Sequence, residues 1–314
     1  MSWAIVGNPG NLPDTSGLGT VTDTYRIAKE EVTNAQYAEF LNVVDPAGVN
    51  PNGLYNNLMG SNVRGGISFT PGNPVGSKYA SRINMGNKPA VYVSWFDAAR
   101  FANWMHNGQG TGGTEIGAYD MTISTPIRLA GATVFLPSEN EWYKAAYYDP
   151  RGAAAAGPPR DNNYWLYPTQ SDNRPVLGSA SAIGDISNSG ANVANYNRSA
   201  DWNGQNGNVT SVGTAMSSSF YGAFDLAGNA YEWNEGVFNE WPFTEARGVS
   251  GGWFGSDASA LESTQRHFGM PESEGFSIGF RIASIPEPTA VGLLLITLVK
   301  FGYRRRRSPR RPES

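Results

Sequence analysis

Cysteine is absent from this sequence of 314 residues. Disulfide bonds, thiolate metal sites and a cysteine nucleophile are therefore excluded. Histidine is almost as scarce, because only His106 and His267 occur. A metal site of three imidazoles cannot form, and a Ser-His-Asp triad would have two candidate bases. The metal chemistry that remains uses oxygen ligands, which suit hard cations such as calcium.

Charged residues are also few, at 16% of the chain. Residues 284–314 carry seven Lys or Arg against two Glu, which leaves 16 basic and 25 acidic side chains in residues 1–283. The main part of the chain is therefore acidic, and we expect it not to bind nucleic acid. The basic C-terminal end is a separate segment.

Glycine (38) and proline (20) are abundant, and aromatic residues make up 12% of the chain. This composition is typical of a loop-rich globular protein, not of a helical bundle or a disordered chain. Long stretches rich in Gly, Asn, Ser and Pro cover residues 46–89, 107–128 and 149–220. Loops of this length indicate binding surface, insertion or irregular packed coil.

Three segments have the pattern of amphipathic helices that begin at a hydroxyl cap. Each has a capping box, formed by Thr33 and Gln36, by Ser94 and Asp97, and by Ser138 and Glu141. Short strands are predicted in residues 24–32, 90–95, 132–137 and 276–283. The alternation in these segments is too brief to predict a strand order.

Five motifs occur in an order that resembles the formylglycine-generating enzyme, or sulfatase-modifying factor, family. They are YRIAKEEVTNAQYAEFLN, KPAVYVSWFDAARFANWMHNG, LPSENEWYKAAYY, YGAFDLAGNAYEWNEG and GFRIA, and together they cover residues 21–283. The resemblance implies an α+β fold, a modified C-type-lectin-like arrangement that is loop-rich with little regular secondary structure. We expect one domain over residues 3–283.

The motif YGAFDLAGNAYEWNEG places Asp225 and Glu232 on either side of a turn at Gly228. Such a turn can point backbone carbonyls between two carboxylates, as a hard cation requires. Family members bind calcium here, and the resemblance implies Asp225, Glu232 and the carbonyls of Gly228 and Ala230 as ligands. The alternative is a structural turn, in which Asp225 caps neighbouring amides and Glu232 meets an arginine.

The resemblance also implies a second calcium site at Asn195 and the carbonyl of Tyr196. That site requires an aspartate before a short GTA-like segment. In this chain the segment is GNVTSVGTA, and Asn208 and Val209 stand near the expected aspartate. The sequence therefore departs from the family pattern at this site.

Residues 247–269 follow the family segment that holds copper between two cysteines. Setting SGGWF against the family's RGGSF places those cysteines at Ser256 and Leu261, and Trp253 at the serine. Starting from Arg247 and Gly248 instead places them near Phe254–Gly255 and Ala260. Neither register supplies sulfur, which copper(I) prefers, so we expect no copper and no formylglycine-generating oxidase activity.

A second enzymatic branch of the family, the ergothioneine-type sulfoxide synthases, uses iron held by three histidines, which this chain lacks. What remains is a degenerate active-site groove with aromatic walls that suit a glycan or a peptide. Its expected residues are Trp253, Ser256, Asp257, Leu261, Arg266 and His267.

The C-terminal segment SIPEPTAVGLLLITLVKFGYRRRRSPRRPES resembles a PEP-CTERM sorting signal. It contains a PEP motif and linker (284–288), a hydrophobic helix (289–303) and a basic tail (304–314). The resemblance implies recognition by an exosortase, transient membrane anchoring and cleavage near the motif. Its marker residues are Pro286, Glu287, Pro288, Arg304, Arg305, Arg306 and Arg307.

A sorting signal of this kind requires an exported chain, yet residues 1–10 lack the pattern of a signal peptide. We expect that the true start lies upstream; the alternative is that export was lost. The sequence thus predicts a noncatalytic, calcium-stabilised recognition or matrix protein, exported to the envelope or outer surface of a bacterium. The alternative is an oxidoreductase or another enzyme with a non-cysteine site around Asp257, Arg266 and His267.

Overall fold

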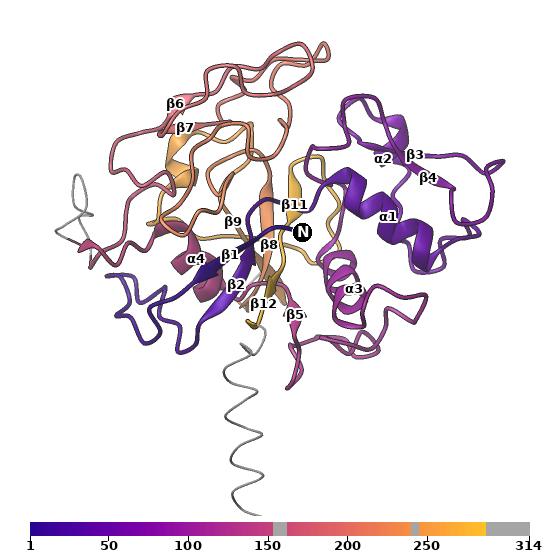
Figure 1. Ribbon diagram of the computed structural model, residues 1–314, viewed down its shortest axis with the longest axis horizontal. Coiled ribbons are helices and arrows are strands. Elements are labelled where there is room, and N and C mark those ends of the chain that lie inside the picture. The colour runs from indigo at the N-terminus through magenta and orange to yellow at the C-terminus, as the bar shows by residue number, and fades with distance from the viewer. Residues whose placement is uncertain (153–161, 240–244, 287–314) are drawn as a thin grey trace, which may run out of the picture.

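Two four-stranded sheets form the centre of the computed structural model, which describes residues 1–152, 162–239 and 245–286. The first sheet has the order β1 (Trp3–Val6), β2 (Tyr25–Ala28), β12 (Ala283–Ser284), β5 (Val134–Phe135), and all its pairs are antiparallel. The second has the order β10 (His267–Gly269), β9 (Ala246–Ser250), β8 (Tyr231–Phe238), β11 (Ile278–Phe280), with β11 parallel to β8. Figure 1 shows α1 and α3 on one side of these sheets and α4 on the other.

The three predicted helices are confirmed as α1 (Asn34–Val44), α3 (Trp95–His106) and α4 (Glu139–Tyr147). Each begins directly after its predicted cap, and both hydrogen bonds of each capping box are present. Short elements complete the fold: α2 (Leu58–Ser61), the 3-10 turn Ala258–Leu261, and the pairs β3 (Ile67–Phe69) with β4 (Tyr79–Ser81) and β6 (Val176–Leu177) with β7 (Val193–Ala194).

Three of the four strand predictions are confirmed, although each strand is shorter than its segment. The prediction for residues 90–95 is wrong, because this segment forms no strand and Tyr92 adopts a φ of 64°. A left-handed backbone at a bulky residue interrupts an extended ladder. The sequence pattern also fails to predict β8, the longest strand of the described chain, because this strand begins within the motif that predicts a turn.

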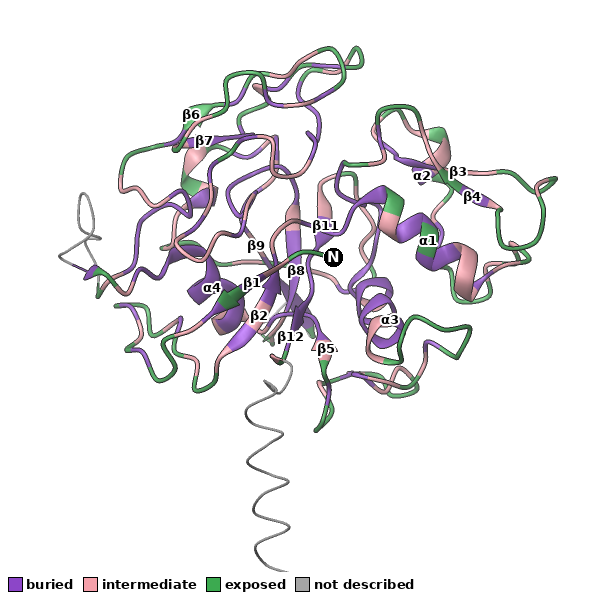
Figure 2. Ribbon diagram, in the orientation of Figure 1, coloured by how far each residue is buried: buried purple, intermediate pink, exposed green. Residues whose placement is uncertain are grey.

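Aromatic side chains build the core. Tyr37, Phe40, Phe101 and Phe280 pack with ring centroids 5.3–6.3 Å apart between α1, α3 and β11. A second cluster packs α4 against β1 and β2. Figure 2 shows buried residues on the inner faces of these elements and exposed residues along the outer loops. The prediction of a loop-rich α+β fold is confirmed.

The first and last strands of the described chain lie in one sheet, where β12 is two strands from β1. Across residues 1–152, 162–239 and 245–286, no helix is long and apolar enough to cross a membrane. The predicted hydrophobic helix (289–303), the basic tail with Arg304–Arg307, and Glu287 and Pro288 lie outside the described residues.

Candidate functional site

A buried ion pair links the two four-stranded sheets. Glu232 lies in β8 and Arg281 lies between β11 and β12, and both side chains are fully buried. Arg281 Nη2 donates to Glu232 Oε1 (2.6 Å), and Trp142 Nε1 of α4 donates to Glu232 Oε2 (2.7 Å). The guanidinium also donates to the carbonyls of Ala28 (3.0 Å) and Phe224 (2.8 Å). One side chain thus holds β2, β8 and the segment before β8 together.

Two further carboxylates lie close to this pair. Asp225, at a φ of 56°, accepts a hydrogen bond from the backbone amide of Gly213. Asn229 donates to both oxygens of the Glu31 carboxylate, at 3.2 and 3.0 Å. Burial raises the pKa of Asp225 to about 6, and burial together with the charges of Asp225 and Glu232 raises the pKa of Glu31 well above its usual value.

These contacts do not fit the predicted first calcium site at Asp225, Gly228, Ala230 and Glu232. Arg281 donates to both oxygens of Glu232, and Trp142 donates to the same carboxylate. Asp225 caps an amide, and Glu232 lies in a strand and not in a turn. Among the described residues, no group of three or more His, Asp or Glu could hold a metal ion. These are the contacts of the structural alternative, in which Asp225 caps an amide and Glu232 meets an arginine.

The second predicted calcium site is polar and buried. Asn195 is 3% exposed, and its Nδ2 donates to the carbonyl of Asn208 (2.9 Å). Its Oδ1 has no partner within the described part of the chain, whereas the carbonyl of Tyr196 accepts from Ser199. Asn208, which stands near the expected aspartate, bonds Val209 N through its own Oδ1. One free oxygen without an aspartate is a weak calcium site, so this site stays a prediction.

The residues of the predicted groove do not converge on one space. Leu261 is fully buried, and Ser256 is 7% exposed with its Oγ bonded to the amide of Trp253 (3.1 Å). Asp257 instead caps the 3-10 turn Ala258–Leu261 through the amide of Ala260. Both cysteine positions of the register that aligns SGGWF with RGGSF are therefore buried.

Arg266 and His267 make their contacts with residues other than Asp257, although the Asp257 charge acts on the His267 ring. Arg266 makes two hydrogen bonds to Glu139 (2.7 and 2.6 Å), and the His267 ring packs on Tyr231 at 5.4 Å. Both line a cavity of about 10 Å³, room for roughly one water molecule. Burial lowers the pKa of His267, and its Nε2 has no partner among the described residues. The cavity is too small for a substrate, and Asp257 does not line it.

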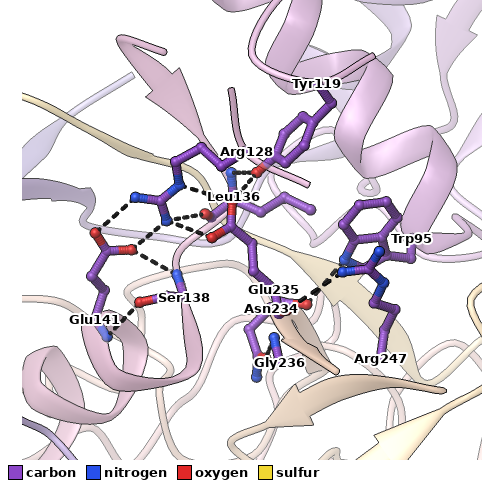
Figure 3. Close-up of polar contacts among 10 residues, drawn as sticks. All are labelled: Trp95, Tyr119, Arg128, Leu136, Ser138, Glu141, Asn234, Glu235, Gly236 and Arg247. Atoms are coloured by element: carbon purple, nitrogen blue, oxygen red, sulfur yellow. Dashed lines mark hydrogen bonds and ion pairs between the residues drawn. The ribbon is translucent and has the colours of Figure 1, made fainter. Parts of the chain in front are cut away.

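A second ion-pair network, which sequence reasoning missed, centres on Arg128. Figure 3 shows its guanidinium between Glu141 of α4 and Glu235 of β8, with Nη2 at 2.6 and 2.7 Å from their oxygens. Tyr119 donates to Glu235 (2.5 Å), and Arg128 lies 3.6 Å from the Phe135 ring. The network borders a surface groove of about 400 Å³. Because both carboxylates are bonded to the guanidinium, neither is a free general base.

Trp253, the aromatic residue of the predicted groove, packs against the loop that contains Phe276. Trp253 packs edge-on against Phe254 (4.7 Å, 72°) and Phe276 (5.7 Å, 67°). The Arg64 guanidinium lies 5.4 Å from the Phe254 ring and 5.2 Å from the Phe276 ring. Trp253 is partly exposed and Phe276 is 37% exposed, so these rings form part of the surface. Sequence reasoning found Trp253 but not Arg64, which is 189 residues away in the chain.

Comparison with known proteins identifies the family. Residues 17–285 match the family described as "Sulfatase-modifying factor enzyme 1-like domain". The chain belongs to this family. The match confirms the family resemblance seen in the sequence motifs. No curated protein matches the sequence.

Solved structures share the fold of this sulfatase-modifying factor domain. "Treponema denticola variable protein 1" has a TM-score of 0.50 at 16% identity, over 90% of this chain and 95% of that chain. CarF has a TM-score of 0.52 at 18% identity, over 91% of this chain and 99% of that chain. At these identities the likeness concerns the fold alone.

Proposed function

We propose that this protein is a noncatalytic member of the sulfatase-modifying factor family that binds a ligand through the surface around Trp253. One observation carries the proposal: Ser256 and Leu261, the cysteine positions in the register that aligns SGGWF with RGGSF, are buried. A serine hydroxyl and an aliphatic side chain offer copper(I) no thiolate. The alternative enzyme finds no support in the contacts, because Asp257 caps a turn while Arg266 pairs with Glu139.

An activity assay tests the noncatalytic part. The full chain, given copper and a sulfatase-type cysteine peptide, should produce no formylglycine, and Ser256→Cys should not restore it because one thiolate leaves the metal under-coordinated. Mass spectrometry of the peptide measures conversion. Turnover by the native chain would refute the proposal.

A binding assay tests the recognition part. The full chain should bind components of a glycan and peptide array, with and without calcium, and Trp253→Ala should weaken that binding because the exposed ring is removed. Arg26→Gln, in β2 of the other sheet, is the control. Absence of any binding on the array would count against a recognition function.

We also propose that the chain is exported to the bacterial envelope or outer surface and that an exosortase processes its C-terminal signal. The position of the motif supports this: β12 ends at Ser284, so cleavage near Pro286 would remove no described strand. Mature surface protein should end between Ile285 and Pro288 and lack the arginine cluster that begins at Arg304. Mass spectrometry of its C-terminus decides this; surface protein that ends at Ser314 would contradict it. Calcium has no part in the proposal, because the first site does not fit and the second lacks an aspartate.

A further inference from the structure

The surface around Trp253 contains two arginines that no described carboxylate neutralises. Arg64 Nη2 donates to the carbonyl of Gly207 (3.0 Å). The backbone amide of Arg198 donates to the carbonyl of Phe254 (2.6 Å), and Arg198 itself is exposed. In the described chain, neither guanidinium has a carboxylate within ion-pair distance. The acidic group of the same loop, Asp201, accepts a hydrogen bond from the amide of Gly207.

Gly207 brings the two arginines together. A Cβ atom on this glycine would lie 2.6 Å from Arg198 Cα, so the Arg198 backbone packs directly against it, while its carbonyl binds Arg64. Burial and the nearby charge of Arg198 both lower the pKa of Arg64. Two like charges are therefore held close together on a protein whose residues 1–283 are acidic overall, an arrangement that an anion would stabilise.

Three of the non-glycine residues with a left-handed backbone lie beside the same surface. Tyr92, Asn197 and Arg198 have φ values of 64°, 53° and 55°, in the left-handed region that non-glycine residues seldom adopt. The Asn197 amide donates to Ser256 O (2.7 Å) and the Tyr92 amide to Gly275 O (2.8 Å), next to Phe276. The Tyr92 hydroxyl, in a side chain 2% exposed, and Arg64 Nε are buried without a partner in the described chain. Strain and unpaired polar atoms of this kind gather at binding sites.

We propose that this Arg64 cluster, defined by Arg64, Arg198, Trp253 and Phe276, binds an acidic saccharide. The two guanidinium groups hold the carboxylate of the sugar through charge-assisted hydrogen bonds. Trp253 and Phe276 pack against the apolar C–H face of the sugar ring. The proposal rests on the proposed recognition function and names its ligand class.

The loop beside the cluster favours a saccharide over an acidic peptide. Residues 197–206 contain three asparagines and one glutamine, and Asn197, Asn203 and Asn206 are exposed. An amide side chain both donates and accepts hydrogen bonds, which matches the paired donor and acceptor character of sugar hydroxyls. A peptide with acidic side chains would use the arginines but would leave most of these amides without hydroxyl partners.

Calorimetry with the full chain tests the proposal. The probes are trigalacturonate, a hyaluronan tetrasaccharide and sialyllactose, each compared with its carboxyl methyl ester, which keeps the rings and removes the charge. At least one acid should bind, and its ester should bind about tenfold more weakly or worse, because a charge-assisted contact is lost. Raising NaCl from about 50 mM to about 500 mM should weaken binding of the acid. Binding of none of the acids, or equal binding of acid and ester, would overturn the proposal.

Variants locate the site. Arg64→Gln and Arg198→Gln should each weaken binding of the acid about tenfold. Arg26→Gln is the matched control, because Arg26 also lies over an aromatic ring, that of Trp3, at 5.3 Å. Melting temperatures show whether each variant folds, and Arg64→Lys, which keeps the charge, should retain more affinity than Arg64→Gln. Unchanged binding in both Gln variants would overturn the proposal, as would equal binding of a glutamate tripeptide.

These outcomes separate the two proposals. A neutral glycan whose binding depends on Trp253 but not on Arg64 would leave the recognition function standing and overturn the acidic-saccharide assignment. Formylglycine production by the native chain would instead refute the noncatalytic function, whatever the outcome of the saccharide titrations.

Discussion

Removal of Arg281 should destabilise the protein more than any exposed charge substitution. The guanidinium is fully buried, donates to Glu232, Ala28 and Phe224, and lies near the carboxylates of Glu31 and Asp225. Removing one partner of a buried ion pair typically costs about 3–5 kcal/mol. Because Arg281→Gln leaves three carboxylates without a cation, we expect the free energy of unfolding to fall by about 5 kcal/mol, at the upper end of that range. Glu232→Gln leaves the Arg281 cation with Asp225 and Glu31 still nearby, so we expect the free energy of unfolding to fall by about 3 kcal/mol.

Urea unfolding at pH 7, followed by tryptophan fluorescence, measures these changes. Arg266→Gln is the control, because Arg266 pairs with Glu139 while its side chain is 49% exposed, and an exposed pair contributes at most about 1 kcal/mol. The double variant at Arg281 and Glu232 should cost less than the sum of the single variants, since the two residues interact. If Arg281→Gln lowers the free energy of unfolding no more than Arg266→Gln does, the stabilising role of the buried ion pair is refuted. A rise in melting temperature with calcium that Glu232→Gln abolishes would also refute it, because a ligand of the native state stabilises by mass action.

Two further predictions concern pH and capping. Burial raises the pKa of Asp225 to about 6, so its contribution to stability is present below its unfolded pKa of about 4 and is lost as the pH rises through about 6. Between pH 4 and pH 7 this group should lower the free energy of unfolding, measured in urea, by about 3 kcal/mol, and Asp225→Asn should remove that decrease. An unchanged dependence of the unfolding free energy on pH in this variant would contradict the assignment. Ser138→Ala should lower the unfolding free energy by about 1 kcal/mol, because the Glu141 amide loses its acceptor, while Ser259→Ala on an exposed turn should change it little. Equal losses in these two serine variants would count against the cap.

The helices and the family could be predicted because their signals are local. Thr33, Ser94 and Ser138 each lie three residues before the partner that completes the capping box, and this spacing is visible in the sequence. The strand signal at residues 90–95 failed for the opposite reason. Its apolar residues are buried, but Tyr92 adopts a positive φ and its amide bonds Gly275, a contact 183 residues away that no local pattern reveals.

The polar sites were harder to predict because their partners are remote. The sequence pattern places Glu232 beside a turn as a calcium ligand, yet it lies in β8 and pairs with Arg281. The signal was present in the family motif GFRIA, which contains Arg281, but charge and spacing alone cannot show which carboxylate an arginine meets. The same applies to Arg128, which binds Glu141 thirteen residues away and Glu235 in another part of the chain.

The buried arginines explain how a chain with such short strands holds its sheets together. Most strands of the described chain are only two to five residues long, so backbone ladders alone offer few hydrogen bonds between segments. Arg281 bonds two carbonyls at the end of β2 and a carboxylate in β8, and Arg128 connects α4 to β8 through two carboxylates. Each guanidinium has five N–H donors in a rigid plane, which suits it to join several segments at one point. Arg64 differs from both, because it has no carboxylate partner among the described residues. Its guanidinium bonds the carbonyls of Asn206 and Gly207 and lies over the rings of Phe254 and Phe276. The arginines with carboxylate partners therefore stabilise the fold, whereas Arg64 is the arginine to which we assign the acidic saccharide.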